Sequence, residues 1–307
     1  MFVIRYRKIF FLLSGILIAL SLYGIFAYGF NESIDFKGGT LTEVTYASST
    51  PSLATMNASV QSLNVGDFTV RPSGANDYII NTLQLTQAQS DALIKAISVG
   101  GISPTIDRSD SVGPSAGAEL KSKAVKAIAV VVIMIVLFVT FAFRRVSHLG
   151  GDKSKAVSSW KYGLATIIAL FHDVVIPTGA FVFLGHFHGT EIDLLFVTGL
   201  LAILGYSVHD TIVVFDRVRE NLKVNRDSGN KEEFETTVGK SVAQTFGRSI
   251  NTSLTIFITL LALYLFGSST TKDFALLLII GVIVGTYSSI FVASPLLVTF
   301  QKWQKSK

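Results

Sequence analysis

The chain has 307 residues, of which 50% are hydrophobic and only 15% are charged. Soluble domains usually carry about 25% charged residues, so the composition favours a membrane protein, in which the placement of positive charge matters more than the net charge of +5. The absence of cysteine excludes disulfides and thiolate metal sites, and no group of His, Asp and Glu has the spacing of metal ligands.

Six stretches are apolar and long enough, at ~20 residues, to cross a membrane as helices. In chain order they cover residues 9–30, 124–143, 162–184, 192–215, 243–266 and 274–300. The first follows a short basic flank, as in a signal peptide, but it is too long for one and no clear cleavage site comes after it. We interpret it as an uncleaved membrane anchor.

A single long polar segment separates the first two membrane helices. Its residue patterns predict strands at 41–47, 67–71, 77–82 and 102–108, and helices at 51–64 and 86–98. The order β-α-β-β-α-β is that of a ferredoxin-like domain. We therefore predict a small α+β domain between the first and second membrane helices.

The predicted fold class is an α-helical polytopic membrane protein with six transmembrane helices and one small ferredoxin-like extracytoplasmic domain. The predicted parts are an N-terminal segment with the first helix (1–30), the extracytoplasmic domain (31–123), and a five-helix domain (124–307) with cytoplasmic loops at 144–161 and 216–242. Within the second loop, the charged stretch 217–240 is interpreted as a solvated helical hairpin; a binding patch for a cytoplasmic partner is the alternative.

Orientation follows from the basic residues. The short loops 185–191 and 267–273 hold only Lys272, whereas Lys and Arg cluster in the segments on the other side. Because cytoplasmic loops carry the excess of Lys and Arg, we expect both termini in the cytoplasm. The protein is then a multi-pass protein of the cytoplasmic (inner) membrane, with the lipid bilayer as its solvent.

Two opposite charges stand out because ionisable side chains inside a membrane are expensive and usually functional. Asp210 and Arg248 each lie five residues inside the cytoplasmic end of consecutive predicted helices, roughly 7 Å deep at 1.5 Å per residue. A buried carboxylate holds a proton more tightly, and an approaching guanidinium loosens it. The pair therefore predicts a proton-coupling site; a permanent ion pair between the helices is the alternative.

Further polar residues surround this pair in the sequence. Tyr206 and Ser207 share the helix face of Asp210. A stripe with helical spacing is formed by Arg248, Asn251, Thr252, Thr255 and Thr259. Because a polar stripe must face protein or water, we expect the fourth and fifth helices to line a polar seam.

Three other residues are secondary proton-site hypotheses: His209, which is next to Asp210, and the neighbours His172 and Asp173 in the third membrane helix. Each could instead be a hydrogen-bonding helix contact. Paired glycines at Gly38 and Gly39, close after Asp35, allow positive φ or close backbone approach. They predict either a hinge or a tight turn at the start of the outer domain. Gly281 and Gly285 have the spacing of a close helix contact.

No motif for an enzyme is present. The sequence has no P-loop for nucleotide hydrolysis and no G-x-S-x-G nucleophile elbow. We therefore predict a transport subunit without catalytic residues, cofactor or metal, with the proton as the coupling ion.

Five strings, in this order and spacing, resemble the SecF family of protein-export membrane proteins. They are residues 35–40 (DFKGGT), 112–120 (VGPSAGAEL), 171–174 (FHDV), 205–221 (GYSVHDTIVVFDRVREN) and 248–253 (RSINTS). The fourth string, at its place in the fourth helix, is the most specific. The resemblance covers nearly the whole chain.

The resemblance implies a function. Members pair with SecD in a twelve-helix complex similar to the RND superfamily, and assist the SecYEG channel by pulling the exported unfolded polypeptide outward with the proton-motive force. Asp210 and Arg248 match the family's proton-transport residues, whereas His209 stands where the family often has Asn. By the same resemblance, YajC and YidC are expected as further partners. No nucleic-acid partner is expected. The alternatives are half of an RND-type exporter, or a structural assembly subunit in which Asp210 is dispensable.

Overall fold

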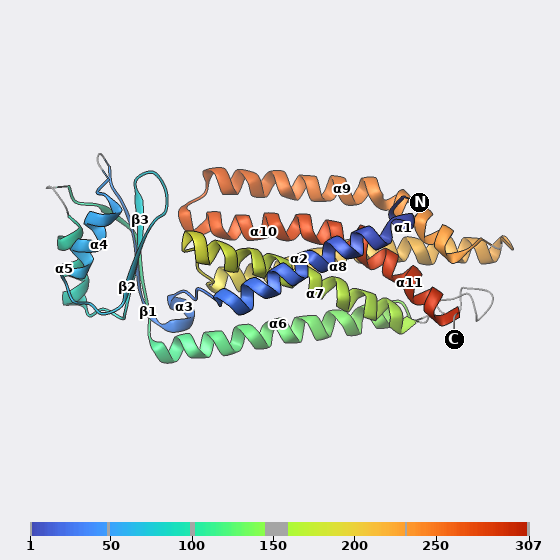
Figure 1. Cartoon of the computed structure of the whole chain (residues 1–307), viewed down its shortest axis with the longest axis horizontal. Helices are drawn as coiled ribbons and strands as arrows, with labels where there is room; N and C mark the ends of the chain where they lie inside the picture. Colours follow the sequence, from blue (N-terminus) through green and yellow to red (C-terminus); the bar gives the residue numbers. More distant parts are fainter. Residues whose placement is uncertain (1, 48–49, 99–101, 145–158, 231, 306–307) are drawn as a thin grey trace. The chain divides into compact units, whose positions relative to one another are not determined.

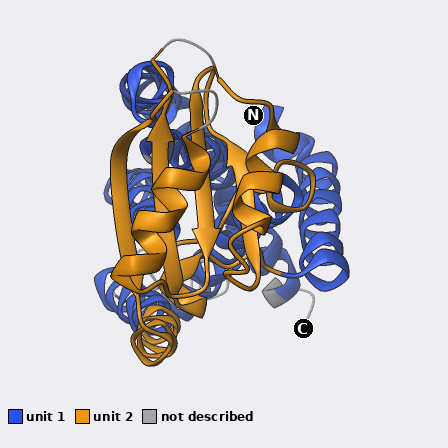
Figure 2. Cartoon of the chain, turned by 90° about the vertical axis from the view of Figure 1, so that its left-hand side faces the viewer, with its two compact units in different colours: residues 1–29, 127–184, 196–307 blue, residues 30–126, 185–195 orange. Residues whose placement is uncertain are grey.

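The computed structural model describes residues 2–47, 50–98, 102–144, 159–230 and 232–305. The chain forms two compact units. Unit 1 contains residues 1–29, 127–184 and 196–307, and unit 2 contains residues 30–126 and 185–195 (Figure 2).

Within these described ranges, six helices are long and apolar enough to cross a membrane, in agreement with the predicted number. A short helix α1 (Phe2–Arg5) precedes the first of them (Figure 1). The first five spans are α2 (Arg7–Tyr28), α6 (Pro114–Ala142), α7 (Ser159–His188), α8 (Leu194–Asp227) and α9 (Phe234–Phe266). The sixth span is interrupted and consists of α10 (Ser269–Ser288), the π-helix η2 (Ser289–Ala293) and α11 (Ser294–Lys305).

The charged stretch 217–240 is helical at both ends, as predicted for a hairpin. Helix α8 continues to Asp227, and α9 begins at Phe234. Asn225 Nδ2 donates to Thr237 Oγ1 at 3.1 Å across the hairpin, and Gly229 turns the chain with φ of 69°. The other predicted cytoplasmic loop, 144–161, lies mostly outside the described residues.

Glycines let helices of unit 1 pack closely, as the spacing of Gly281 and Gly285 predicts. A Cβ atom at Gly281 would collide with Ile203 of α8, and one at Gly285 would lie 3.1 Å from Ser207 Cβ. The close contact is thus within this chain, between α10 and α8. It brings the polar residues of these two helices together.

Unit 2 contains a four-stranded antiparallel sheet. Its strands are β1 (Gly39–Thr45), β2 (Phe68–Pro72), β3 (Asp77–Thr82) and β4 (Thr105–Val112), in the order β2-β3-β1-β4. Its helices are α3 (Ile34–Lys37), α4 (Leu53–Gln61) and α5 (Gln87–Ile97), and α4 and α5 lie on one face of the sheet (Figures 1 and 2). Tyr46, Met56, Ile80 and Leu93 fill the core between them. The topology confirms the ferredoxin-like prediction.

The last strand lies later in the chain than the sequence pattern predicts. It begins at Thr105 instead of 102 and reaches Val112 instead of ending near 108, because its pairing with β1 runs from Thr45 to Gly39. The residues that extend it, Ser109 to Ser111, have little strand preference of their own. Tertiary pairing therefore decides the strand end.

Residues 185–195, predicted as part of a short outer loop and the next helix start, belong to unit 2. Ile192 N donates to Asn31 O at 2.8 Å, and Ser33 N donates to Ile192 O at 3.0 Å. Asp35 Oδ2 accepts from the backbone N–H of Leu194 at 2.9 Å. Since Leu194 is the first residue of α8, Asp35 satisfies an unpaired N–H at the start of this helix.

Candidate functional site

Asp210 is buried in α8, at the centre of a group of hydroxyl donors. Its Oδ1 accepts from Ser249 Oγ of α9 at 2.5 Å, and its Oδ2 accepts from Ser289 Oγ of η2. Three helical segments thus converge on this carboxyl group. Burial of a carboxylate without hydrogen bonds would be costly, and these hydroxyls supply them.

Arg248 does not contact Asp210 within this chain. Its side chain is exposed on α9, and within the described ranges it makes no ion pair or hydrogen bond. Successive helix residues differ by about 100° in direction, so the neighbour Ser249 occupies the inward position that the sequence interpretation gave to Arg248. Asp210 therefore faces the interior of the chain, and Arg248 faces away from it.

The predicted polar stripe on α9 faces outward from the chain with Arg248. Its members Asn251, Thr252, Thr255 and Thr259 are exposed. The polar seam between α8 and α9 exists, but on the α9 side it is built from the buried Ser249 and Ser253. Sequence spacing found a polar face and could not tell which of two faces turns inward.

Asp173 of α7 is the most enclosed carboxyl group in the described part of unit 1, with 0% exposure. His172 Nδ1 lies 2.8 Å from its Oδ1. Its Oδ2 accepts from Ser288 Oγ of α10 at 2.7 Å and also from Ser207 Oγ of α8. The carboxyl group therefore has partners on its own helix and on two others.

His172 is buried beside Tyr287 of α10, with ring centroids 5.8 Å apart and ring planes 17° from parallel. The Tyr287 hydroxyl donates to Phe10 O of α2 at 2.9 Å. The second ring nitrogen of His172, Nε2, is buried and has no hydrogen-bond partner among the described residues. His209, in contrast, is exposed on α8.

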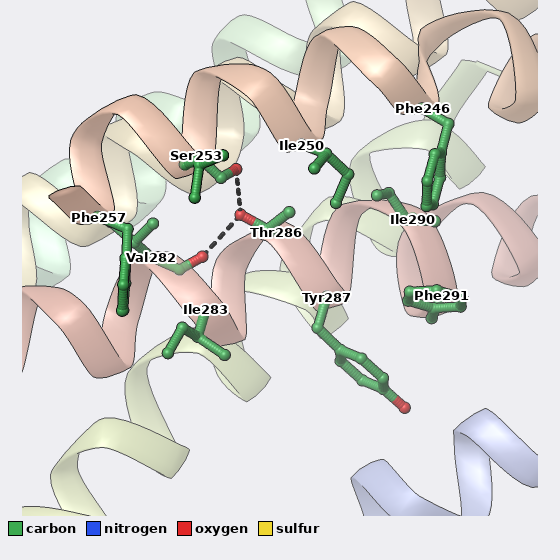
Figure 3. Close-up of a pocket in the computed structure, with 11 residues that line it drawn as sticks. Phe246, Ile250, Ser253, Phe257, Val282, Ile283, Thr286, Tyr287, Ile290 and Phe291 are labelled. Carbon is green, nitrogen blue, oxygen red and sulfur yellow. Dashed lines mark hydrogen bonds between the residues drawn. The ribbon is translucent and has the colours of Figure 1, made fainter.

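Tyr206 extends the hydroxyl network between α8, α9 and α10. Its hydroxyl lies 2.5 Å from Ser253 Oγ and 3.3 Å from Thr286 Oγ1. Ser253 and Thr286 are themselves 2.6 Å apart, and Thr286 also donates to Val282 O at 2.7 Å. Figure 3 shows that Ser253 and Thr286 point toward one another. They line one side of a groove of ≈ 320 Å³ whose other side chains are aliphatic or aromatic.

The sequence interpretation missed the contribution of α10 and η2. Ser288 and Ser289 are adjacent in sequence, yet Ser288 donates to Asp173 and Ser289 donates to Asp210. The π-helix begins at Ser289, and π-helical turns are frequent at functional sites. The available signal was the polar run Thr286 to Ser289 inside an otherwise apolar stretch.

The paired glycines form a close contact in unit 2. Gly38 has a φ of 80°, and a Cβ there would lie 2.8 Å from Pro114 Cα. Gly39 has a φ of 139°, and a Cβ there would collide with Thr82 O. The string at 35–40 therefore packs against the start of the string at 112–120. The geometry matches a tight turn, and the hinge role stays a prediction.

The chain is similar to known protein-export proteins over nearly its whole length. The family described as "Protein export membrane protein SecD/SecF, C-terminal" matches residues 94–151 and 156–303, and the "SecD/SecF GG Motif" matches residues 23–50. Protein translocase subunit SecF of Thermobaculum terrenum is 38% identical, with 97% of this chain and 93% of that protein covered. The SecF subunit of Anaerolinea thermophila is 37% identical, with coverage of 96% and 92%.

A longer relative carries the same region as part of a single chain. Protein translocase subunit SecDF of Thermus thermophilus is 34% identical over 95% of this chain, which spans 37% of that protein. The crystal structure of SecDF, a translocon-associated membrane protein from Thermus thermophilus, matches with a TM-score of 0.83 and 32% identity. The match covers 97% of this chain and 38% of the SecDF chain. Because both family models match and SecF relatives are 37–38% identical over nearly the whole chain, this chain belongs to the SecF family of protein translocase subunits.

Proposed function

We propose that this chain uses the proton-motive force to assist translocation through the SecYEG channel, pulling or releasing the exported unfolded polypeptide on the outer side. The observation that carries the proposal is Asp210, a buried carboxyl group in a membrane helix whose partners in the described part of the chain are hydroxyl groups rather than a cation. An ionisable side chain inside a membrane is expensive and is a functional hypothesis by default. Hydroxyl partners can donate to the ionised carboxyl group and accept from the protonated one, so these surroundings suit a group that binds and releases a proton.

The exposed stripe on α9 supports SecD as the partner that completes the site. Arg248, Asn251 and Thr252 are exposed in this chain, and a polar stripe within a membrane needs protein or water against it. In the SecDF relative, more than half of the chain lies outside the matched region. We propose that the helices of SecD cover this stripe and that Arg248 reaches Asp210 only in one state of the complex.

The proposed orientation places unit 2 outside the cytoplasmic membrane and both termini in the cytoplasm. Basic residues on the hairpin 217–240 support it. In this orientation, unit 2 can meet the emerging polypeptide. SecYEG, with YajC and YidC, are the proposed further partners on grounds of family resemblance.

The test is export of a secreted reporter in cells with Asp210→Asn, at a protein level matched to the wild type. Asparagine keeps the shape and hydrogen-bonding capacity of the residue but cannot carry the proton. We expect precursor to accumulate in a pulse-chase, and its processing to lose sensitivity to moderate changes in the proton gradient.

Asp227→Asn, an exposed carboxylate at the end of the same helix, is the matched control and should export normally. Unchanged export and unchanged gradient dependence in Asp210→Asn would contradict the proposal. That outcome would favour a structural assembly subunit whose partner does the proton work.

A further inference from the structure

A second buried carboxyl group shares the construction of the Asp210 site. Asp173 and Asp210 each accept hydrogen bonds from one serine of a neighbouring spanning helix and from one of two consecutive serines, Ser288 and Ser289. Ser207, which binds Asp173, lies one helical turn from Asp210 on α8. The two carboxyl groups are therefore joined through residues one helical turn apart on α8 and through consecutive residues at the α10–η2 junction.

We propose that Asp173 and His172 form a second proton-binding site, coupled to Asp210 through Ser288 and Ser289. The inference deepens the proposed proton-coupled function and rests on it for its physiological role. Its ligand is the proton, delivered by water to His172.

The serine hydroxyls can satisfy both charge states of the carboxyl groups. A hydroxyl has one hydrogen, yet Ser288 Oγ has two acceptors in reach, Asp173 Oδ2 at 2.7 Å and Gly285 O at 3.1 Å. When Asp173 is ionised, Ser288 donates to it. When Oδ2 gains a proton, the new O–H donates to Ser288 Oγ, and Ser288 turns its hydrogen to Gly285 O. The hydrogen bond between the two groups is kept, with its direction reversed.

Ser289 has the same choice at the other carboxyl group. It donates to Asp210 Oδ2 or, at 3.0 Å, to Thr286 O. Ser288 and Ser289 are thus matched two-way partners at consecutive positions. A carbonyl three residues back is in reach of a helical serine hydroxyl, so the helix itself provides the second acceptor that the reversal uses.

His172 provides the route for the proton. Hydrogen bonding to ionised Asp173 requires a hydrogen on Nδ1, so in the neutral ring Nε2 carries a lone pair. That lone pair is buried without a partner among the described residues, and a buried polar atom of this kind usually has a water. Water gives a proton to Nε2, and the Nδ1 proton moves to Asp173 Oδ1. There it donates back to Nδ1, or rotation of the carboxyl group places it at Oδ2, where it donates to Ser288 Oγ. One proton is added in total, and the imidazole ends neutral as the other tautomer.

The surroundings leave His172 as the exchanging group for Asp173. The groups that face this pair in the described structure are Ser207 of α8, Ser288 and Tyr287 of α10, and, through Tyr287, Ser14 and Phe10 O of α2. No Lys or Arg of the described ranges forms an ion pair with either carboxyl group.

The experiment is infrared difference spectroscopy of the full-length chain in lipid vesicles, titrated from low to high pH, with the carbonyl stretch of protonated carboxyl groups as the readout. We expect Asp173→Asn to remove one component that Asp210→Asn retains, and Asp210→Asn to remove another. His172→Gln should shift the Asp173 component along the pH axis.

A second variant pair keeps the test valid if Asp173→Asn fails to fold. Ser288→Ala should shift the Asp173 component and leave that of Asp210 in place, and Ser289→Ala should do the reverse. Thr166→Val is the matched control. Thr166 lies on α7, the helix of Asp173, and its buried hydroxyl donates to the backbone of Tyr162. It should change neither component.

The proposal is overturned if the spectra of Ser288→Ala and of folded Asp173→Asn are those of the wild type throughout the titration. Export is not part of this readout, so the two proposals can fail separately. If Asp210→Asn loses export but no carbonyl component is assigned to Asp173, the proposal of a second site is wrong and the proposed function stands.

Discussion

Glu191 illustrates how much a single side chain depends on its tertiary position. It lies in the segment 185–195 of unit 2, where Asn81 Nδ2 donates to its Oε1. Burial raises the pKa of the Glu191 carboxyl group, and the nearby charges of Arg71 and Lys37 oppose this only in part. A raised pKa means that the folded state binds the proton more tightly than the unfolded state does.

The packing of residues 185–195 against the rest of unit 2 should therefore weaken as the pH rises. The loss begins near the ordinary glutamate pKa of about 4.3 and continues through the raised pKa of Glu191. At most about a tenfold change per pH unit is expected, since one proton is linked. Glu191→Gln, which stays neutral, should remove this dependence. Hydrogen-exchange protection of the Ile192 and Leu194 amides measures it, with the exposed Asp91→Asn as control. Equal pH slopes in wild type and Glu191→Gln would refute this account.

At the scale of elements, the short string at 35–40 acts on two of them. Its glycines form the junction between α3 and β1, and its aspartate caps the start of α8. Gly39 starts β1 with a φ that side chains rarely adopt, beside the backbone of Thr82 in β3. Asp35, four residues earlier, accepts from the first N–H of α8. The same short motif thus fixes the start of the central strand and the start of the helix that carries Asp210.

Gly39→Ala should destabilise the sheet by at least about 1–3 kcal/mol, because of the strained φ alone, with a further cost from the collision with Thr82 O. Gly113→Ala is the matched control, since a Cβ there has nothing within 4 Å. Hydrogen exchange of the β1 and β3 amides in the two variants provides the comparison. A similar loss of protection in both, or in neither, would rule out the close contact as the reason for this glycine.

At the scale of the whole molecule, the membrane surface of the chain is incomplete. Large apolar side chains are exposed along α2 and α6, such as Leu12, Phe26, Met134 and Phe138, as lipid-facing helices require. Helix α9 also exposes large apolar side chains, such as Leu254 and Ile258, but beside them it exposes Arg248 with its polar neighbours. This polar stripe is the part of the surface that is suited to a protein partner rather than to lipid.

The proposed orientation predicts which positions a membrane-impermeant maleimide can reach. The chain has no cysteine, so a single introduced thiol reports one site without background. Ala88→Cys, exposed on unit 2, should be labelled in intact spheroplasts, and Lys223→Cys, exposed on the hairpin, only after permeabilisation. The opposite pattern would reverse the topology.

Several features could be predicted from the sequence because their cause is local. Each membrane span is a continuous apolar run of sufficient length, and each strand or helix of unit 2 has its own residue periodicity. Asp210 was found for the same reason: a charge within an apolar run is visible without any neighbour. Both aspartates and His172 were recognised in this way, although their partners were not.

The partners were decided by tertiary structure. Whether Ser249 or Arg248 meets Asp210 depends on the rotation of α9, and adjacent helix residues differ by about 100°. Asp173 takes its hydrogen bonds from residues 34 and 115 positions away, and segment 185–195 pairs with residue 31 through backbone atoms that every sequence has. Composition and periodicity determine which side chains must leave the lipid; the packing of the helices determines which of them meet, because hydrogen bonds act over a few ångströms between groups that are distant along the chain.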